Sequence, residues 1–317
     1  MTIEHQLEVP RELATQRIDQ AVASLLPQYS RAKLQAWIRS GQLTVDGELV
    51  RQKDKVCGGE EVTISAEEAS LQAEPQDIPL AVLHEDDSLL VINKPPSLVV
   101  HPGAGNPDGT IMNALLHRDA KAALMPRAGI VHRLDKDTSG LLVVARTASV
   151  QLQLIAMLQE HEVSRHYDAL VHGVPARKTG SVEAPIGRHK VRRTLMTVRP
   201  DGKPAVTHYE VRATFPAASA ALLECRLETG RTHQIRVHMQ SIGHPLIGDA
   251  TYGGGAGTGK RSKAPKDLAA KLLAFPRQAL HARALAFRHP VTGEAMRFAA
   301  PAPDDFAPLL EFLSQKQ

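Results

Sequence analysis

The chain has 317 residues, of which 43% are hydrophobic and 23% are charged, and these values are typical of a globular protein rather than a disordered or fibrous one. Its apolar runs fall far short of the roughly 20 residues that a membrane-spanning helix needs, and no apolar stretch follows Met1, so we expect a protein that is neither membrane-bound nor exported by a signal peptide. The two cysteines, Cys57 and Cys225, lie far apart, which favours a reducing cytoplasm over a disulfide or a cysteine-based zinc site.

Basic residues are concentrated in the larger C-terminal part of the chain. Residues 1–77 hold 8 lysines and arginines against 13 acidic residues, whereas residues 78–317 hold 30 against 21. This excess favours a polyanionic partner such as a nucleic acid, and a basic surface without such a partner is an equally common explanation. Aromatic residues make up only 3% of the chain, too few for a broad base-stacking platform, so recognition of RNA would depend on phosphate contacts and shape.

The N-terminal part predicts a small unit that carries basic side chains. Residues 1–16 are predicted to be a polar tail, and a helix capped by Ser30 is expected to run to Ser40. Asp46 and Gly47 separate two short apolar segments and predict a hairpin turn. The helix also carries three candidate contacts for an RNA backbone, for which an ordinary solvated helix face is the alternative: Arg31, Lys33 and Arg39.

A linker is predicted over residues 66–77, because this stretch is rich in Ala, Glu and Gln and lacks apolar periodicity. In residues 78–317, strand-like and helix-like segments mix without regular alternation, so we expect an α+β fold rather than a doubly wound sheet. The glycine-rich segment 253–266 lacks the strand and spacing of a phosphate-binding loop, which argues against an NTPase. Helices are expected at 110–118, 150–160 and 232–242, and strands at 89–92, 98–100, 130–132, 141–145, 167–171, 206–213 and 221–227.

The densest polar cluster is residues 129–140, GIVHRLDKDTSG, which lies between two apolar segments that would hold it rigidly. Asp135, flanked by Arg133 and Lys136, is expected to stay ionised and to serve as a nucleophile or base. A salt-bridged turn without catalytic function is the alternative. Paired with Asp137, the carboxylate would also suit a glycosidase or an N-glycosidase, but such an enzyme accounts poorly for the basic surface.

A second polar cluster, residues 229–239, opens a predicted helix. At about 100° per residue, His233, Arg236 and Gln240 share one face, from which Arg236 could reach an acidic or phosphate group. A solvent-facing arginine is the alternative. The histidines do not favour a metal site, because a pair such as His233 and His238 is five residues apart and does not share a helix face.

A short basic run between residues 188 and 193 is the third candidate region. It is either a solvated charge run or, if the partner is RNA, a strand or loop that contacts phosphates. Its cations are Arg188, Lys190, Arg192 and Arg193.

Together these clusters resemble the RluA-type family of pseudouridine synthases, and most closely those members that act on the large ribosomal subunit. The resemblance covers nearly the whole chain and includes residues 17–65, which are similar to the S4-like RNA-binding domain of many members. The motifs that carry it are HRLD at 132–135 with TSG at 138–140, RHYDA at 165–169, GRTHQIRVH at 230–238 and LIGD at 246–249.

The resemblance implies a catalytic domain over residues 78–317 with a mixed, mainly antiparallel sheet, and isomerisation of uridine to pseudouridine without a cofactor or metal. By the same resemblance, Asp135 is the catalytic aspartate, Arg236 pairs with it, Tyr167 stacks on the target base and Arg133 helps to extrude the uridine. A plain core tyrosine is the alternative for Tyr167, because its neighbours in the predicted strand are apolar. The implied substrate is the subunit-interface stem-loop of 23S ribosomal RNA, in the cytoplasm. A non-catalytic RNA-binding assembly factor is the hypothesis from another class.

Overall fold

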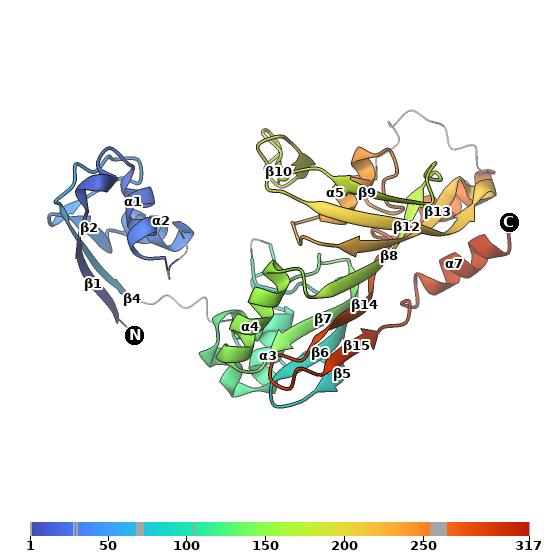
Figure 1. The fold of residues 1–317 in the computed structure, drawn as a ribbon, viewed down its shortest axis with the longest axis horizontal. Helices are drawn as coiled ribbons and strands as arrows, with labels where there is room; N and C mark the ends of the chain where they lie inside the picture. The colour runs from blue at the N-terminus through green and yellow to red at the C-terminus, as the bar shows by residue number, and fades with distance from the viewer. Residues whose placement is uncertain are drawn as a thin grey trace. The chain divides into compact units, whose positions relative to one another are not determined.

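The computed structural model describes residues 2–27, 29, 31–67, 73–103, 105–253 and 265–316. The chain divides into two compact units, Met1–Gln72 and Ala73–Gln317 (Figure 1). Three sequence predictions fall on residues outside the described ones: the Ser30 cap, the middle of the predicted linker, and the middle of the glycine-rich segment.

The N-terminal unit is a four-stranded sheet with two helices. The strands follow the order β1-β4-β2-β3, and Leu34, Trp37 and Ile38 of the second helix are buried in the core of the unit. The tight turn between β2 and β3 has positive φ at Asp46 and Gly47, the conformation expected of a type I′ hairpin turn. The elements are β1 (Thr2–Glu8), α1 (Ile18–Leu25), α2 (Arg31–Ser40), β2 (Leu43–Val45), β3 (Glu48–Leu49) and β4 (Glu61–Glu67).

The prediction of a polar tail over residues 1–16 is wrong. Strand β1 pairs antiparallel with β4 along its whole length, and Ile3 and Leu7 pack against the core of the unit. A strand needs apolar residues only at every second position, and the alternation in TIEHQLE meets that requirement. Because the outward positions are polar, the average polarity of the segment concealed the pattern.

The C-terminal unit is built on a nine-stranded sheet in the order β5-β6-β7-β14-β8-β13-β12-β9, with β15 paired to β14. Only the β7–β14 pair among these is parallel, so the predicted mixed, mainly antiparallel sheet is confirmed. The strands are β5 (Ala81–Glu85), β6 (Leu89–Lys94), β7 (Ser139–Ala145), β8 (Ser164–His172), β9 (Thr179–Glu183), β12 (Val206–Phe215), β13 (Ala220–Leu227), β14 (Leu280–Arg288) and β15 (Ala295–Ala299).

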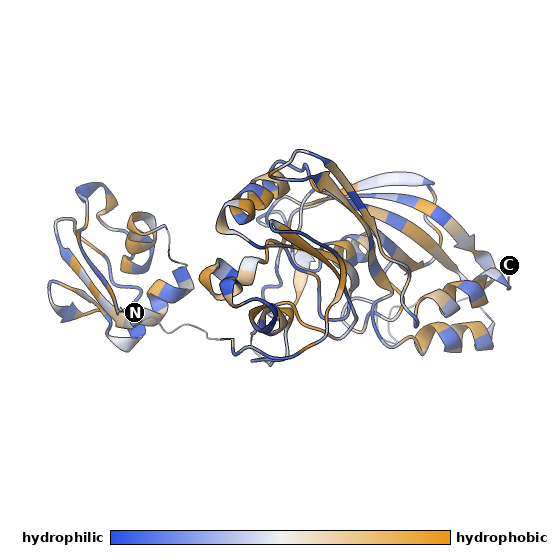
Figure 2. Ribbon diagram, turned by 90° about the horizontal axis from the view of Figure 1, so that it is seen from below, coloured by the Kyte–Doolittle hydropathy of each residue, from blue (hydrophilic) through white to orange (hydrophobic). Residues whose placement is uncertain are grey.

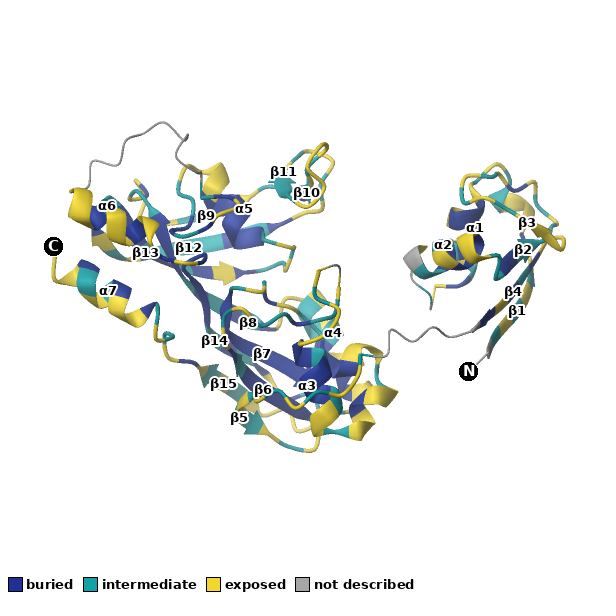
Figure 3. Ribbon diagram, turned by 180° about the vertical axis from the view of Figure 1, so that it is seen from behind, coloured by how far each residue is buried: buried dark blue, intermediate teal, exposed yellow. Residues whose placement is uncertain are grey.

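Helices cover both faces of this sheet, so its central strands are buried on both sides (Figure 3). Helices α3 and α5 pack on one face, whereas α4 packs on the other face over β6 and β7 and α6 and α7 pack there over β8 and β13. Strand β7 is buried along its whole length, as expected of a strand covered on both faces, and the strands in the middle of this unit are mostly hydrophobic in colour (Figure 2). The helices are α3 (Ile111–Arg118), α4 (Ala148–Gln159), α5 (Gln234–Ser241), α6 (Lys266–Leu273) and α7 (Ala307–Ser314).

Several local predictions for this unit can be compared with the structure. Helix α3 begins after Thr110, whose side chain forms a capping box with Asn113, so the predicted capped helix is confirmed. The segments predicted as strands at 98–100 and 130–132 form single bridges instead, Val99 with Thr110 and Ile130 with Val144. None of the described helices is long and apolar enough to cross a membrane.

Candidate active site

Asp135 lies in the loop that leads into β7, and the backbone that follows it is held from both sides. The amide of Thr138 donates to the carbonyl of Asp135 at 3.1 Å and closes a tight turn. Nζ of Lys94 donates to the carbonyl of Lys136 at 2.7 Å, and Nη1 of Arg277 donates to the carbonyl of Asp137 at 3.0 Å. Together these bonds fix the three peptide units between Asp135 and Thr138.

Both of these cations are buried and have further partners. The ammonium of Lys94 also donates to the carbonyls of Pro95 and Leu98, so three acceptors match its three protons. Burial lowers the pKa of Lys94 to about 7. The guanidinium of Arg277 binds both oxygens of Asp305, at 2.6 and 2.7 Å, which ties the start of the C-terminal segment to the same loop.

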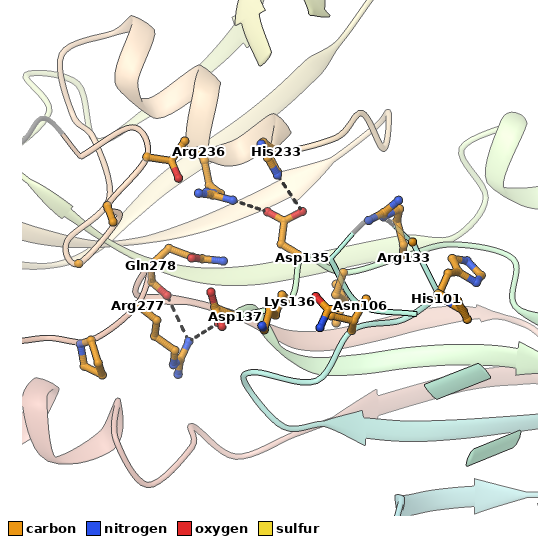
Figure 4. Close-up of a pocket in the computed structure, with 18 residues that line it drawn as sticks. His101, Asn106, Arg133, Asp135, Lys136, Asp137, His233, Arg236, Arg277 and Gln278 are labelled. Atoms are coloured by element: carbon orange, nitrogen blue, oxygen red, sulfur yellow. Dashed lines mark hydrogen bonds and ion pairs between the residues drawn. The ribbon is translucent and has the colours of Figure 1, made fainter. Parts of the chain in front are cut away.

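The carboxylate of Asp135 forms an ion pair with Arg236, the third residue of α5. Nη1 of Arg236 lies 3.0 Å from Oδ2 of Asp135. Nε and Nη2 of the same guanidinium bind the two oxygens of Asp249 at 2.7 and 2.9 Å. Figure 4 shows Arg236 and His233 reaching Asp135 from the same side, and Nε2 of His233 lies 3.9 Å from Oδ1 of Asp135.

One guanidinium therefore serves two carboxylates of different exposure. Burial would raise the pKa of Asp249, but the hydrogen bonds and charge of Arg236 hold that pKa below its usual value. Burial disfavours the charge of Arg236, whereas Asp249 and then Asp135 raise its pKa. The Asp249 side chain is 0% exposed, and that of Asp135 is 17% exposed. Of the two carboxylates that share Arg236, only that of Asp135 can therefore be reached from the solvent.

A pocket of about 480 Å³ opens beside this carboxylate, within the range of cavities that hold small organic ligands. Arg133, Asp135, His233 and Arg236 line it, together with the loop that carries His101. Nδ1 of His101 is buried without a hydrogen-bond partner. Burial first, and then the charges of Arg127 and Arg133, lower the pKa of His101 to about 4, so a neutral ring faces this part of the pocket.

The structure brings three of the four residues predicted at the catalytic site to the pocket wall and buries the fourth, Tyr167, in the apolar core. Arg133 is exposed and lines the pocket with Asp135 and Arg236. Tyr167 of β8 is 6% exposed and belongs to the apolar core. Burial raises the pKa of Tyr167, the charge of Arg165 opposes this shift, and the charge of Asp135 adds to it.

The basic run of residues 188–193 forms the turn of a hairpin between β10 (Ile186–Arg188) and β11 (Met196–Val198). Nδ1 of His189 accepts hydrogen bonds from the amides of Val191 and Arg192, which orders the turn. The four predicted contact residues are all exposed on it: Arg188, Lys190, Arg192 and Arg193.

Two of the three basic residues predicted in the N-terminal unit have intramolecular partners. Arg31 binds the buried Asp19 at 2.7 Å. The ammonium of Lys33 lies 5.2 Å from the ring centroids of Tyr29 and Trp37. Arg39, near the end of α2, is exposed.

The sequence interpretation did not identify several residues of the site. Asp249 stands in the LIGD motif, whose position after α5 was the available signal. Lys94 and Arg277 donate hydrogen bonds to backbone carbonyls, and the hydroxyl of Tyr252 is hydrogen-bonded to His233. Because these partners are distant in the sequence, no local sequence pattern identifies the three residues. Among the described residues, no group of three or more His, Cys, Asp or Glu side chains is placed to hold a metal ion.

Comparisons with known proteins agree with this geometry. Residues 88–241 match the RNA pseudouridylate synthase family and residues 16–62 match the S4 domain. The chain is 53% identical over 302 residues to ribosomal large subunit pseudouridine synthase D of Vibrio vulnificus, covering 94% of this chain and 91% of the relative. It is 52% identical over 312 residues to the protein of that name from Xanthomonas campestris, covering 98% and 92%.

Two solved structures are also similar. Human RNA Pseudouridylate Synthase Domain Containing 4 has a TM-score of 0.55 at 29% identity and covers 74% of this chain and 93% of that structure. Human RNA Pseudouridylate Synthase Domain Containing 1 has a TM-score of 0.53 at 24% identity, with coverage of 78% and 98%, and shows similarity of fold.

Proposed function

The chain belongs to the RNA pseudouridylate synthase family and carries an S4 domain, and on this premise we propose that it isomerises uridines of large-subunit ribosomal RNA with Asp135 as the catalytic carboxylate. The observation that carries the assignment of Asp135 is its ion pair with Arg236 at the wall of the pocket. The relatives named for the large ribosomal subunit support the choice of RNA.

The reaction rearranges one nucleotide and needs no external reactant. The C1′–N1 bond of uridine breaks, the uracil turns, and C5 bonds to C1′; C5 then loses a proton and N1 gains one. Attack on the nucleotide and abstraction of the 2′ proton are the two routes open to Asp135, and both require its ionised form. Arg236 supports that form and orients it, because it is itself fixed by Asp249.

The roles proposed for Arg133 and Tyr167 follow from the exposure of each side chain. A uridine must leave its helical stack before it can enter the pocket, which costs a few kcal/mol, and the exposed Arg133 at the pocket wall is placed to favour the extruded state. Tyr167 is buried in the apolar core and does not line the pocket, so contact between its ring and the uracil requires the base to pass beyond the pocket wall.

Contacts with the RNA backbone are assigned to the exposed hairpin residues Arg188, Lys190, Arg192 and Arg193 and to the S4 domain. Within the S4 domain, Arg39 is exposed, whereas Arg31 is bound to Asp19. Ribosomal RNA of bacteria, from which the named relatives come, is made in the cytoplasm, and we place the protein there.

Site-by-site pseudouridine mapping of ribosomal and transfer RNA tests this function. Cells that lack the gene are complemented with the wild-type protein or with Asp135→Asn. Loss of marks in large-subunit RNA, restored by the wild-type protein alone, supports both the substrate and the carboxylate. An unchanged map would favour a non-catalytic assembly factor, and release of free uracil would favour an N-glycosidase.

A further inference from the structure

We propose that Tyr252 is a positioning residue that couples the basic hairpin β10–β11 to Asp135 by fixing His233. The inference rests on the proposed function, because it assigns to the hairpin a contact with RNA. Tyr252 follows Asp249 in the loop after α5 and is 3% exposed, and it is absent from the pocket wall. Any effect on the reaction must therefore pass through its neighbours.

The hydroxyl of Tyr252 joins the hairpin to His233, the residue that precedes α5. The amide of Met196 donates to this oxygen at 2.8 Å, and Nδ1 of His233 lies 2.8 Å from the same oxygen. Met196 stands directly opposite Arg188 in the hairpin register. One oxygen atom therefore connects the strand that carries the basic turn to the histidine that faces Asp135.

The proton on that oxygen determines which nitrogen of His233 is protonated. The amide of Met196 can only donate, so the tyrosine oxygen accepts from it, and its single proton is directed to Nδ1 of His233. Burial lowers the pKa of His233, although Asp135 opposes the shift, so the ring is neutral near pH 7. His233 then carries its proton on Nε2, which lies 3.9 Å from Oδ1 of Asp135.

The backbone of His233 also depends on these contacts. Its φ of 56° and ψ of 23° lie in the left-handed region, which L residues adopt rarely and which is often found at functional sites. The rings of His233 and Tyr252 pack edge to face, with their centroids 5.5 Å apart. Tyr252 is thus one of the contacts that hold this conformation.

Tyr252 contacts the second partner of Asp135 as well. The guanidinium of Arg236 lies 4.9 Å from the centroid of its ring. The amide of Tyr252 donates to Oδ1 of Asp249 at 3.0 Å, and Asp249 in turn binds Arg236. Both groups that approach the carboxylate of Asp135 therefore pack against one buried tyrosine.

The base of the hairpin and Tyr252 share a small apolar core. Ile186, Val237 and Tyr252 are buried together in this core, and Met196 packs against it. A phosphate held at the turn 188–193 stabilises one position of the hairpin. Through Met196 and Tyr252, that position is transmitted to His233 and to the carboxylate.

Tyr252→Phe tests the hydroxyl alone, since the ring that packs against Arg236 is retained. We expect kcat for a ribosomal RNA stem-loop to fall between about 10- and 100-fold, the cost of a small misplacement of catalytic groups, with KM and RNA affinity nearly unchanged. Tyr209→Phe removes the same atom from a half-buried tyrosine of β12 and serves as the matched control. Wild-type kcat in Tyr252→Phe, or a loss of RNA affinity alone, would overturn the proposal.

A double-mutant cycle tests the coupling to the hairpin. Arg192→Gln is combined with Tyr252→Phe, and kcat/KM is measured for the four proteins. If the hydroxyl carries the coupling, Arg192→Gln has a smaller effect in the Tyr252→Phe background than in the wild-type background. Strictly additive effects would contradict it.

A third measurement does not depend on catalysis and so separates this inference from the proposed function. The ¹⁵N shifts of the His233 ring, assigned with a His233→Gln variant, report which nitrogen is protonated. We expect the proton on Nε2 in the wild-type protein and a shift toward Nδ1 in Tyr252→Phe. An unchanged tautomer would refute the role of the hydroxyl, whereas an inactive wild-type protein with the expected tautomers would refute only the proposed function.

Discussion

Each of the two units buries an aspartate that binds an arginine, and the two arrangements differ in how fully the carboxylate is occupied. In the N-terminal unit, Asp19 is 0% exposed and binds Arg31 at 2.7 Å, Arg17 at 3.1 Å and Gln35 at 2.6 Å. In the C-terminal unit, Asp249 is equally buried, but Asp135 has Arg236 on one oxygen and the pocket beside it.

This difference distinguishes a carboxylate whose oxygens are all bound within the protein from one that is open to a ligand. Asp19 joins α1 to α2, and its oxygens are occupied by side chains of the protein. Oδ1 of Asp135 has His233 at 3.9 Å, which is beyond hydrogen-bond distance, so it remains available to a substrate. Asp249 holds Arg236 in place as Asp19 holds Arg31. The C-terminal unit thus contains both a fully bound carboxylate, Asp249, and an open one, Asp135.

Asp135→Asn is expected to have the largest effect on turnover, because it removes the negative charge that faces the pocket and leaves the Arg236–Asp249 ion pair in place. We expect pseudouridine formation on a large-subunit stem-loop to fall by about 10³-fold or more, with RNA affinity within about twofold of wild type, since this carboxylate makes no phosphate contact. Turnover and RNA binding are measured separately.

Asp137→Asn is the comparison within the same loop, since Asp137 lies near Ser97 rather than Arg236. A much smaller loss of turnover is expected for it. Equal losses in the two variants would mean that the loop, and not the carboxylate of Asp135, is what the reaction requires.

Asp249→Asn is expected to have the next largest effect, because it weakens the anchor of Arg236. Removing one charge of a buried pair costs about 3 kcal/mol of stability, and a less firmly held Arg236 should lower turnover by about 10- to 100-fold. Thermal unfolding and single-turnover kinetics measure the two effects. Asp19→Asn makes the same change at the other anchor, and a comparable loss of turnover there on a short stem-loop would contradict the distinction between the units.

The sequence identified the residues that line the pocket better than the residues that hold them in position. Asp135, Arg133 and Arg236 belong to dense polar motifs and all lie at the pocket. The interpretation of Arg236 left a solvent-facing side chain open, whereas the residue is 6% exposed. Its burial depends on Asp249, which lies in a later segment, and helical periodicity alone contains no information about that contact.

The same reasoning explains which parts of the fold were missed. Strand β7 is buried on both faces and gave a continuous apolar run, and α3 has an explicit cap. Strand β15 alternates exposed and half-buried residues, so it resembles a loop in composition. Lys94 and Arg277 reach carbonyls 42 and 140 residues away in the chain, and only the folded chain reveals such partners.

Arg31→Ala tests the anchor of the N-terminal unit, and its effect is confined to that unit. Leaving Asp19 buried with fewer donors should cost about 1–3 kcal/mol of that unit's stability, with turnover on a short stem-loop unchanged. Arg39→Ala, at an exposed arginine of the same helix, should leave stability close to wild type. If both substitutions weaken RNA binding equally and neither affects unfolding, Arg31 is a phosphate contact after all.

Acid unfolding tests the contacts of Asp19 in a second way. Burial would raise the pKa of Asp19, but hydrogen bonds from Arg31 and Gln35 hold it below its usual value. A carboxylate whose pKa is lowered on folding contributes its stability in full above its unfolded pKa of about 3.9 and loses it as the pH falls through the folded value. Unfolding of the unit below about pH 4 should therefore be less steep with pH in Asp19→Asn, and an unchanged slope would assign the acid sensitivity to other groups.

The hairpin should show the smallest effect, because its cations are exposed and each of them would neutralise a single phosphate. Arg192→Gln should weaken binding several-fold and reduce the salt dependence of log K by about 0.7–0.9 for each phosphate that the variant no longer neutralises. Lys178→Gln removes the same charge from an exposed lysine beside a different pocket and should leave the slope unchanged. Affinity measured between low and high salt distinguishes the two variants. Equal slopes would mean that the hairpin contributes only net charge, whereas a difference would locate an RNA phosphate at the turn of the hairpin, whose strand residue Met196 contacts Tyr252.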